Sequence, residues 1–384
     1  MEPHGPSHHL YVHVPFCRLV CAYCDFVTVG GRSDEMGRYA DALLAELAIR
    51  PRPGALATIY FGGGTPSLMP VASIERVVGA AIEGWGSTPT EVTAEANPSR
   101  REAPDWTGLR TAGVNRISLG LQSLRDPELA ALARGHTASE ARAAFDAARV
   151  AFDNVSIDLI YAIPGQSLTD WREGLRAAVA LGPDHLSLYA LQLALQPDEW
   201  AAPPRAGALR WRQRMQARQD DELAADQYRL AEEVLDAAGY RHYELSSWAR
   251  PGCESRHNRA YWERRPYTGI GAGAHSFDGA TRSWNVRDLD RYLAEAGRRR
   301  PLEGQEELTA PTLEFEALAL GLRLVDGLSR STFAAEFGAD PVERYAGAVA
   351  QTTGIGLLEV RGDLLRLSPA GRLLANEALV AFAP

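Results

Sequence analysis

The chain contains no lysine, and all 40 of its basic residues are arginine. This absence excludes a Schiff base to a carbonyl or pyridoxal cofactor, a lysine general base and a phosphate loop of the GxxxxGK type. An arginine- and alanine-rich composition that reflects coding bias accounts for the missing lysine equally well. The absence therefore removes mechanisms without pointing to one.

Long hydrophobic runs are also absent. No apolar stretch reaches membrane-spanning length, and the first residues lack the basic start and apolar centre of a signal peptide. With 49 acidic residues the formal net charge is −9, which disfavours nucleic acid and anionic membranes because neutralising phosphates needs a basic surface. We expect a cytoplasmic protein with no integral membrane segment and no nucleic-acid partner.

Cysteine is scarce, with four residues in 384. Three of them, Cys17, Cys21 and Cys24, follow the spacing CxxxCxxC, and so few cysteines do not form a disulfide framework in a chain of this length. Three thiolates on a short loop can hold three irons of a 4Fe-4S cubane and leave the fourth iron open. Zinc or simple packing is the alternative, although a closed zinc site uses four ligands and the remaining Cys253 is isolated.

The first half of the chain alternates apolar β-type runs with amphipathic stretches. The predicted strands are Leu10–Val14, Ala57–Phe61, Glu91–Ala96, Asn115–Leu121, Val155–Ala162 and His185–Leu193. The predicted helices are Asp34–Ile49, with Ser33 as its N-cap, Ala72–Ile82, Ser139–Ala151 and Thr169–Ala180. Six strands separated by helices imply right-handed crossovers and a parallel sheet, either curved into a partial or complete α/β barrel or open and doubly wound.

Beyond Gln192 the pattern changes. A proline-rich stretch at 197–204 precedes one long polar helix predicted from Gln213 to Ala238, and Tyr240–Ser276 is dense in aromatic residues and glycine. We expect a disordered terminus rather than a metal site at the histidines near the start of the chain, His4, His8 and His9.

The last part of the chain, from about Thr309, has a winged-helix-like order of elements. It reads as two helices, a hairpin of Leu357–Val360 and Leu364–Leu367, and a terminal helix. Residues 340–384 hold four arginines against five acids, so a structural or partner-docking module is a better interpretation than a DNA-binding one.

Polar residues and glycines recur where the predicted parallel strands end, which is where ligands bind in an α/β barrel. The second strand leads into 62–66, Gly-Gly-Gly-Thr-Pro, where missing side chains let the backbone approach a ligand. The third strand runs to Glu95, the fourth to Gln122, and the fifth holds Asp158, while Arg134 follows the fourth on the next helix. Each of these residues could instead serve only a structural role, in a turn, a helix cap or a surface ion pair. Their recurrence beside the cysteine loop predicts a binding site.

The cysteine loop resembles that of the radical S-adenosylmethionine (SAM) enzymes. Within that superfamily, five motifs resemble the oxygen-independent coproporphyrinogen III oxidase group: YVHVPFC, GGGTP, EANP, LGLQ and IDLIYAIPGQ. The resemblance covers essentially the whole chain and implies an α/β fold, a partial (β/α)6 barrel with a smaller, mainly helical, winged-helix-like C-terminal domain. We accordingly divide the chain into a barrel domain at 1–240, a linking region at 241–308 and a C-terminal domain at 309–384.

The same resemblance implies cofactors and their ligands. Cys17, Cys21 and Cys24 would ligate a 4Fe-4S cluster whose open iron takes the methionyl amine and carboxylate of SAM. By position in the motifs, the residues that match SAM contacts are Tyr11, Tyr23, Gly63, Gly64, Thr65, Glu95, Gln122, Arg134 and Asp158. Tyr11 alternates away from Leu10 and Val12, so we expect it to lean over the cluster from the face that holds His13.

The group contains two activities, and two departures decide between them. Its dehydrogenases carry a fourth cysteine two residues after the third, where this chain has Phe26. Residues 257–262 read HNRAYW, which resembles the HNxxYW signature of the HemW-type heme chaperones. If this segment is helical, His257 and Tyr261 share one face, and imidazole is a common axial ligand of heme iron. We therefore predict His257 as the heme ligand.

We expect a heme chaperone without catalytic residues, and the enzymatic alternative is coproporphyrinogen III dehydrogenase. The expected partners are heme and apo-hemoprotein acceptors among membrane respiratory proteins, to which a monomer or homodimer would deliver heme, with peripheral membrane association allowed. If the protein binds heme, the side chains fit to pair with its propionates are arginines near His257, namely Arg256, Arg259, Arg264 and Arg265. The sequence leaves open whether they face the pocket or the solvent.

Overall fold

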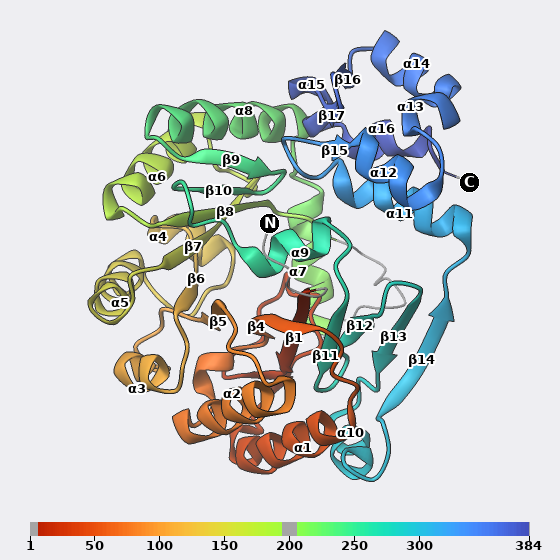
Figure 1. Ribbon diagram of the computed structural model, residues 1–384. Coiled ribbons are helices and arrows are strands. Elements are labelled where there is room, and N and C mark those ends of the chain that lie inside the picture. The colour runs from red at the N-terminus through yellow and green to blue at the C-terminus, as the bar shows by residue number, and fades with distance from the viewer. Residues whose placement is uncertain (1–6, 194–205, 384) are drawn as a thin grey trace.

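The computed structural model describes residues 7–193 and 206–383. Within this part of the chain, 12 strands form one sheet in the order β14-β13-β12-β11-β1-β4-β5-β6-β7-β8-β10-β9 (Figure 1). The parallel strands that follow one another along the chain are β1 Ser7–Val14, β4 Ala55–Gly63, β5 Glu91–Ala96, β6 Arg116–Gln122, β7 Val155–Tyr161 and β8 His185–Ala190. All six predicted strands are present.

The order of these six strands decides between the two predicted architectures. Each strand pairs in parallel with the next one along the chain, and the order never reverses. With right-handed crossovers such a sheet has its helices on one face, and in Figure 1 they surround the sheet on the outside. The terminal strands β14 and β9 do not pair with each other. The partial barrel is confirmed, and the doubly wound sheet is excluded.

The helices of this first part largely follow the predicted ones. They are α1 Met36–Ile49, α2 Val71–Trp85, α3 Trp106–Thr111, α4 Asp126–Ala131, α5 Ala138–Ala151, α6 Leu168–Leu181, α7 Ala206–Gln216 and α8 Asp221–Ala237, with 3-10 turns at Ser33–Glu35 and Pro66–Leu68 and short strands β2 Phe16–Cys17 and β3 Val29–Gly30. Ser33 does not cap α1 as predicted, because the 3-10 turn intervenes and Glu35 is the N-cap residue without a side-chain bond.

The single long helix predicted from Gln213 to Ala238 is wrong. The segment forms α7 and α8, and the carboxylate of Asp220 accepts a hydrogen bond from the Leu223 amide at 3.0 Å. A capping carboxylate in the middle of a polar run starts a new helix, which the amphipathic pattern alone did not reveal. The proline-rich stretch at 197–204 lies outside the described residues.

Strand alternation gives the barrel an apolar outside and a polar inside. In β1, Leu10 and Val12 are fully buried in the core beneath the helices, whereas Tyr11 shares the opposite face with His13 and lies 3.1 Å from its Nδ1 through its hydroxyl. The predicted alternation of Tyr11 is therefore observed, and the polar inner face leaves the barrel interior available for ligands.

The start of the described chain is ordered, contrary to our expectation for the N-terminal histidines. His8 and His9 belong to β1 and are buried. Nε2 of His8 lies 2.9 Å from the hydroxyl of Thr268, and Nδ1 of His9 lies 2.8 Å from that of Thr58. These partners come from strands distant in sequence, so the sequence near the terminus did not show them. His4 lies outside the described residues.

Residues 241–307, placed by the sequence in a linking region, add strands to both ends of the sheet. These elements are β9 Arg241–Glu244, β10 Ser247–Ala249, α9 Arg256–Trp262, β11 Tyr267–Ile270, β12 His275–Phe277, β13 Thr281–Asn285, α10 Leu289–Glu295 and β14 Leu302–Glu307. Strand β10 pairs with β8 and β11 pairs with β1. The division at residues 240 and 308 stays a prediction.

The C-terminal part has its own hydrophobic core and lies beside the barrel (Figure 1). Its elements are α11 Ala310–Gly321, β15 Leu328–Ser329, α12 Arg330–Phe337, α13 Pro341–Arg344, α14 Ala346–Gly354, β16 Leu358–Arg361, β17 Leu364–Leu367, α15 Pro369–Leu373 and α16 Ala375–Val380. The predicted hairpin is present as β16 and β17, and β15 completes a three-stranded sheet. The winged-helix-like order is confirmed, although four helices rather than two precede the hairpin and two short helices rather than one follow it.

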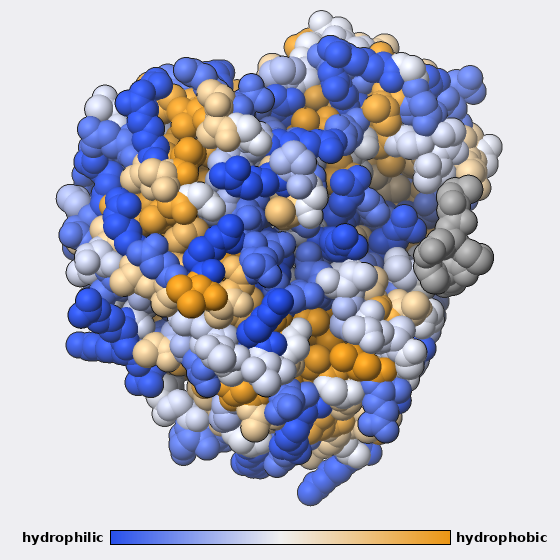
Figure 2. Space-filling model, turned by 60° about the vertical axis from the view of Figure 1, so that its left-hand side comes forward, coloured by the Kyte–Doolittle hydropathy of each residue, from blue (hydrophilic) through white to orange (hydrophobic). Residues whose placement is uncertain are grey.

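The described helices include none that is both long and apolar enough to cross a membrane. On the face shown in Figure 2, apolar residues form separate patches interrupted by hydrophilic ones.

Candidate functional site

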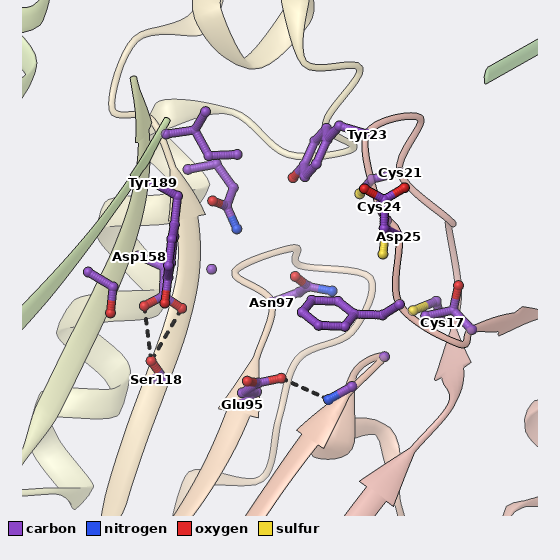
Figure 3. A pocket seen from close by; sticks show the side chains of 18 of the residues that line it. Cys17, Cys21, Tyr23, Cys24, Asp25, Glu95, Asn97, Ser118, Asp158 and Tyr189 are labelled. Atoms are coloured by element: carbon purple, nitrogen blue, oxygen red, sulfur yellow. Dashed lines mark hydrogen bonds between the residues drawn. The ribbon is translucent and has the colours of Figure 1, made fainter. Parts of the chain in front are cut away.

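A cavity of about 440 Å³ opens at the carboxyl ends of the parallel strands. The cysteine loop forms one side of it, and Asp158, Ser118 and Tyr189 lie across from the cysteines (Figure 3). Of the predicted ligands, those that line the cavity are Cys17, Cys21, Tyr23, Cys24, Gly63, Gly64, Glu95, Gln122, Arg134 and Asp158. The structure thus brings together ten of the thirteen predicted site residues.

The three thiols of the cysteine loop occupy separate points on the cavity wall (Figure 3). The amide of Cys24 donates to the Cys21 carbonyl at 3.2 Å and closes a tight turn, while the Thr65 hydroxyl donates to Sγ of Cys17 at 3.7 Å. Thiolates are the ligands of iron-sulfur clusters, so three thiols of one loop on a cavity wall are a donor set that fits a cluster.

Burial makes the free thiols poor anions. Desolvation raises the pKa of Cys17 to about 12 and that of Cys24 to about 11. A metal ligand must be the thiolate, and the positive charge of iron would offset this desolvation.

A buried arginine that we did not predict contacts the cysteine loop, although the two lie 190 residues apart in the sequence. Arg212 of α7 is 1% exposed. Its Nε donates to the Ala22 carbonyl at 2.9 Å and its Nη2 donates to the Cys24 carbonyl at 3.0 Å, and Nη2 also lies 2.6 Å from a carboxylate oxygen of Asp25. Arg212 therefore fixes the backbone that positions the cysteines.

Two glycines at the end of β4, Gly63 within the strand and Gly64 just after it, occupy positions where a side chain would not fit. Gly63 has a φ of +112°, and an added Cβ would lie 2.4 Å from the ring of His13. A Cβ on Gly64 would lie 2.7 Å from the backbone oxygen of Phe16. Glycine is needed at these positions because the end of the strand packs closely against its neighbours, including the loop that carries Cys17.

Glu95 and Asp158 are carboxyls on the polar inner face of the barrel. Glu95 accepts hydrogen bonds from the Tyr60 hydroxyl at 2.8 Å and from the Gly63 amide at 3.1 Å, and Asp158 accepts from the Ser118 hydroxyl at 3.2 Å (Figure 3). Desolvation raises the pKa of Glu95 to about 7 and that of Asp158 to about 6, although these hydrogen bonds oppose it. A cationic ligand group would favour the ionised forms.

Glu95→Gln should change how the free energy of unfolding depends on pH. Because the pKa of Glu95 lies near 7 in the folded protein and near 4.5 otherwise, its stabilising contribution is present below pH 4.5 and is lost as the pH rises through 7. Between pH 5 and pH 8, urea denaturation of the unliganded protein should show the variant gaining about 2–3 kcal/mol relative to wild type. The exposed Glu83→Gln serves as the control, and parallel profiles of Glu95→Gln and wild type would refute the assignment.

Arg134 joins the cysteine loop to the strand ends. Its Nη1 donates to Sγ of Cys21 at 3.1 Å and to the Tyr23 hydroxyl at 3.3 Å, and its Nη2 donates to Oδ1 of Asn97 at 2.9 Å and to the Gly120 carbonyl at 3.0 Å. It lies in the connection between α4 and α5, not on a helix as predicted. Arg134 and Asn97 also line a second cavity of about 390 Å³.

Gln122 shows backbone strain at the end of β6. Its φ is +65°, and the pairing register with β7 shifts between Leu119 and Gln122. A non-glycine residue in the left-handed region is a costly conformation that clusters at functional sites. The bulge places Gln122 on the cavity wall.

Three predicted site residues do not line the cavity: Tyr11, Thr65 and His257. Thr65 is buried behind the loop, with its hydroxyl accepting from Nδ2 of Asn97 at 2.8 Å. Tyr11 lies beneath the site, where its ring centroid is 6.2 Å from that of Tyr60.

His257 lies on α9 as the HNxxYW pattern predicts, but its side chain is buried inside the barrel. Only 1% of it is exposed. Its Nδ1 lies 2.7 Å from the Thr58 hydroxyl, its Nε2 lies 2.9 Å from the Tyr261 hydroxyl, and its ring stacks on Tyr60 at 5.0 Å. Both ring nitrogens therefore have protein partners in this structure.

Sequence reasoning missed several residues of the cavity wall. They are Asn97, Arg116, Ser118, Ser187, Tyr189 and Asn258. The signal was available for most of them, since Ser118 and Arg116 lie on the inward face of β6 at even spacing from Gln122, and Ser187 and Tyr189 alternate in the same way on β8. Asn97 is the asparagine of the EANP motif and lies two residues after Glu95.

Comparison with known proteins relates both parts of the chain to one family. The model of the radical SAM superfamily matches residues 11–178, and that of the HemN C-terminal domain matches residues 308–374. The heme chaperone HemW of Mycobacterium tuberculosis is 39% identical over 383 residues, covering 97% of this chain and 94% of that protein. HemW of Synechocystis is 37% identical, covering 83% of this chain and 78% of that protein.

Among solved structures, coproporphyrinogen III oxidase (HemN) from Escherichia coli matches with a TM-score of 0.82 at 22% identity, covering 98% of this chain and 90% of that one. This match shows the shared fold, while the full-length identity to the HemW relatives shows the family and confirms the resemblance inferred from the motifs. The chain belongs to the HemW heme chaperone family of the radical SAM superfamily.

Proposed function

We propose that this protein binds heme and passes it to apo-hemoproteins while carrying a SAM-bound 4Fe-4S cluster. The relatives from Mycobacterium tuberculosis and Bacillus subtilis, which match over 97% of this chain, are named heme chaperones, and the donor set of the cysteine loop suits a cluster.

The observation that carries the proposal is the apolar edge of the cavity. Phe26 is 63% exposed and Leu19 is 54% exposed, and both line the cavity. Phe26 stands where the dehydrogenases of the group carry a cysteine, so a thiol is replaced by an aromatic surface. Exposed apolar side chains at a cavity mouth offer a flat macrocycle such as heme a hydrophobic contact.

The residues of the cavity have separate roles in this proposal. Cys17, Cys21 and Cys24 would hold the cluster, and Gly63, Gly64, Glu95, Gln122, Arg134 and Asp158 would hold SAM, with Tyr11, Tyr23 and Thr65 shaping the surroundings. When bound, the cluster with SAM supplies one-electron chemistry. Glu95 and Asp158 would bind cationic or hydroxyl groups of SAM, and Arg134 would orient the cysteine loop through its four hydrogen bonds.

The role of His257 as heme ligand stays a prediction. Ligation would require α9 to release the hydrogen bonds of His257 to Thr58 and Tyr261. A shift of the Soret band of the heme complex in His257→Ala would support ligation, whereas an unchanged spectrum and affinity would place the iron ligand elsewhere.

Heme titration of the anaerobically reconstituted protein tests the proposed function. We expect a saturable Soret change at about one heme per chain and transfer of that heme to an apo-hemoprotein. Phe26→Ala should lower the heme affinity about 5- to 30-fold, because truncating a phenyl ring removes about 1–2 kcal/mol of apolar contact. No heme complex, together with anaerobic turnover of coproporphyrinogen III in the presence of SAM, would establish the dehydrogenase instead.

We propose membrane respiratory proteins as the acceptors, reached by peripheral association of a monomer or homodimer. Transfer assays with an apo-respiratory protein in vesicles, and the molar mass of the heme-loaded protein, test these points.

A further inference from the structure

Arg116 is a buried arginine without a partner. It projects from β6, is 2% exposed and lines the cavity. Within the described part of the chain its guanidinium makes no hydrogen bond and no ion pair, and its Nε is buried and unsatisfied. An arginine is always charged in proteins, and a buried charge without a partner is costly. Such a group is suited to an anion that enters the cavity.

The carboxyls around Arg116 offset its charge only from a distance. Glu95 and Asp158 line the same cavity, and the charge of Arg116 lowers the pKa of both against the effect of burial, but neither carboxylate lies within ion-pair distance of Arg116 in the described structure. The amide group of Asn258 shares the cavity wall with Arg116 and can donate to the oxygens of an anion, whereas the hydroxyl of Ser118 already donates to Asp158.

The backbone of Arg116 lies at the amino end of β6, six residues before Gln122, which is about 20 Å along an extended strand. The guanidinium beside the cysteines is that of Arg134. The anion for Arg116 therefore belongs to a second ligand, or to the end of that ligand that lies far from the cysteine loop.

The arginines near His257 that are fit to pair with heme propionates are engaged elsewhere. Arg259 and Arg265 pair with Glu263, Arg264 pairs with Glu336 of α12, and Arg256 donates to Thr90. These four arginines are absent from the cavity lining. The sequence left open whether these four arginines face the pocket or the solvent, and in this structure each of them has a partner outside the cavity.

We propose that Arg116 binds a carboxylate of the ligand that enters the barrel, which is a propionate of heme if the proposed function holds. The planar guanidinium pairs with a carboxylate through two parallel hydrogen bonds. Arg116 is thus a binding residue for the acidic side chains of the tetrapyrrole.

Heme and heme dimethyl ester, whose propionates are blocked, test this assignment in the reconstituted protein. Wild type should bind heme about 10- to 100-fold more tightly than the ester, because a charge-assisted hydrogen bond is lost. Arg116→Met should bind both at the affinity that wild type has for the ester. Arg259→Met, an exposed arginine of α9, should behave like wild type.

The outcomes separate the two proposals. Absence of any heme complex with wild type removes the proposed function and this inference with it. Heme binding that is equally tight in wild type and Arg116→Met leaves the function and overturns the role of Arg116. A loss of SAM affinity in Arg116→Met, with heme affinity unchanged, would assign the arginine to SAM and also overturn the inference.

Discussion

Cys21→Ala is expected to abolish the iron-sulfur cluster after anaerobic reconstitution. Two remaining thiols on this loop cannot replace the third, because the spread arrangement places each at a different point of the cavity wall. Cys21 also accepts a hydrogen bond from Arg134 at 3.1 Å, so its loss frees the guanidinium that links the loop to Asn97 and Gly120. Iron content and visible absorption should fall by more than about tenfold, in line with loss of a metal ligand.

The fourth cysteine provides a matched control for this experiment. Cys253 follows β10 and does not line the cavity, so Cys253→Ala should keep the full cluster. SAM affinity should fall in Cys21→Ala and stay unchanged in Cys253→Ala, which separates loss of the cluster from general misfolding. A Cys21→Ala protein that retains a full cluster would falsify the assignment of the loop.

The parts of the site that follow from local sequence were predictable. The cysteine spacing, the glycines after β4 and the polar ends of the strands are local patterns, and parallel pairing then brings the strand ends to one edge. Alternation also predicts that Tyr11 faces away from Leu10, and the structure agrees. These features need no knowledge of how distant segments pack.

The residues that sequence reasoning missed depend on distant packing. Arg212 meets the carbonyl of Ala22 across 190 residues of sequence, and no local pattern in α7 distinguishes it from its exposed neighbour Arg214. The HNxxYW pattern likewise predicts that His257 and Tyr261 share a face, but not that this face packs against β4 in the interior. The direction in which a helix face points depends on how the helix packs against distant segments.

Arg212→Met should weaken the retention of the cluster, although it changes no cluster ligand. Removing the guanidinium leaves the half-buried carbonyls of Ala22 and Cys24 without this donor, and an unpaired acceptor costs up to about 1–3 kcal/mol where it is buried. Asp25 is 43% exposed, so water compensates its loss in part. We expect the free energy of unfolding to fall by about 2–3 kcal/mol and reconstituted iron to drop below about half of the wild-type amount.

Matched variants distinguish support of the cysteine loop by the hydrogen bonds of Arg212, here called the brace, from general packing of α7. The exposed Arg214→Met should change neither stability nor iron content, and Asp25→Asn should have a smaller effect than Arg212→Met because it keeps the two hydrogen bonds to the loop carbonyls. The rate at which a chelator removes iron from the loaded protein is the decisive readout, since a mobile loop exposes its thiolates more often. Faster iron release in Arg212→Met under conditions where it is fully folded supports the brace. Unchanged release together with lower stability would mean that Arg212 only packs the helix against the barrel.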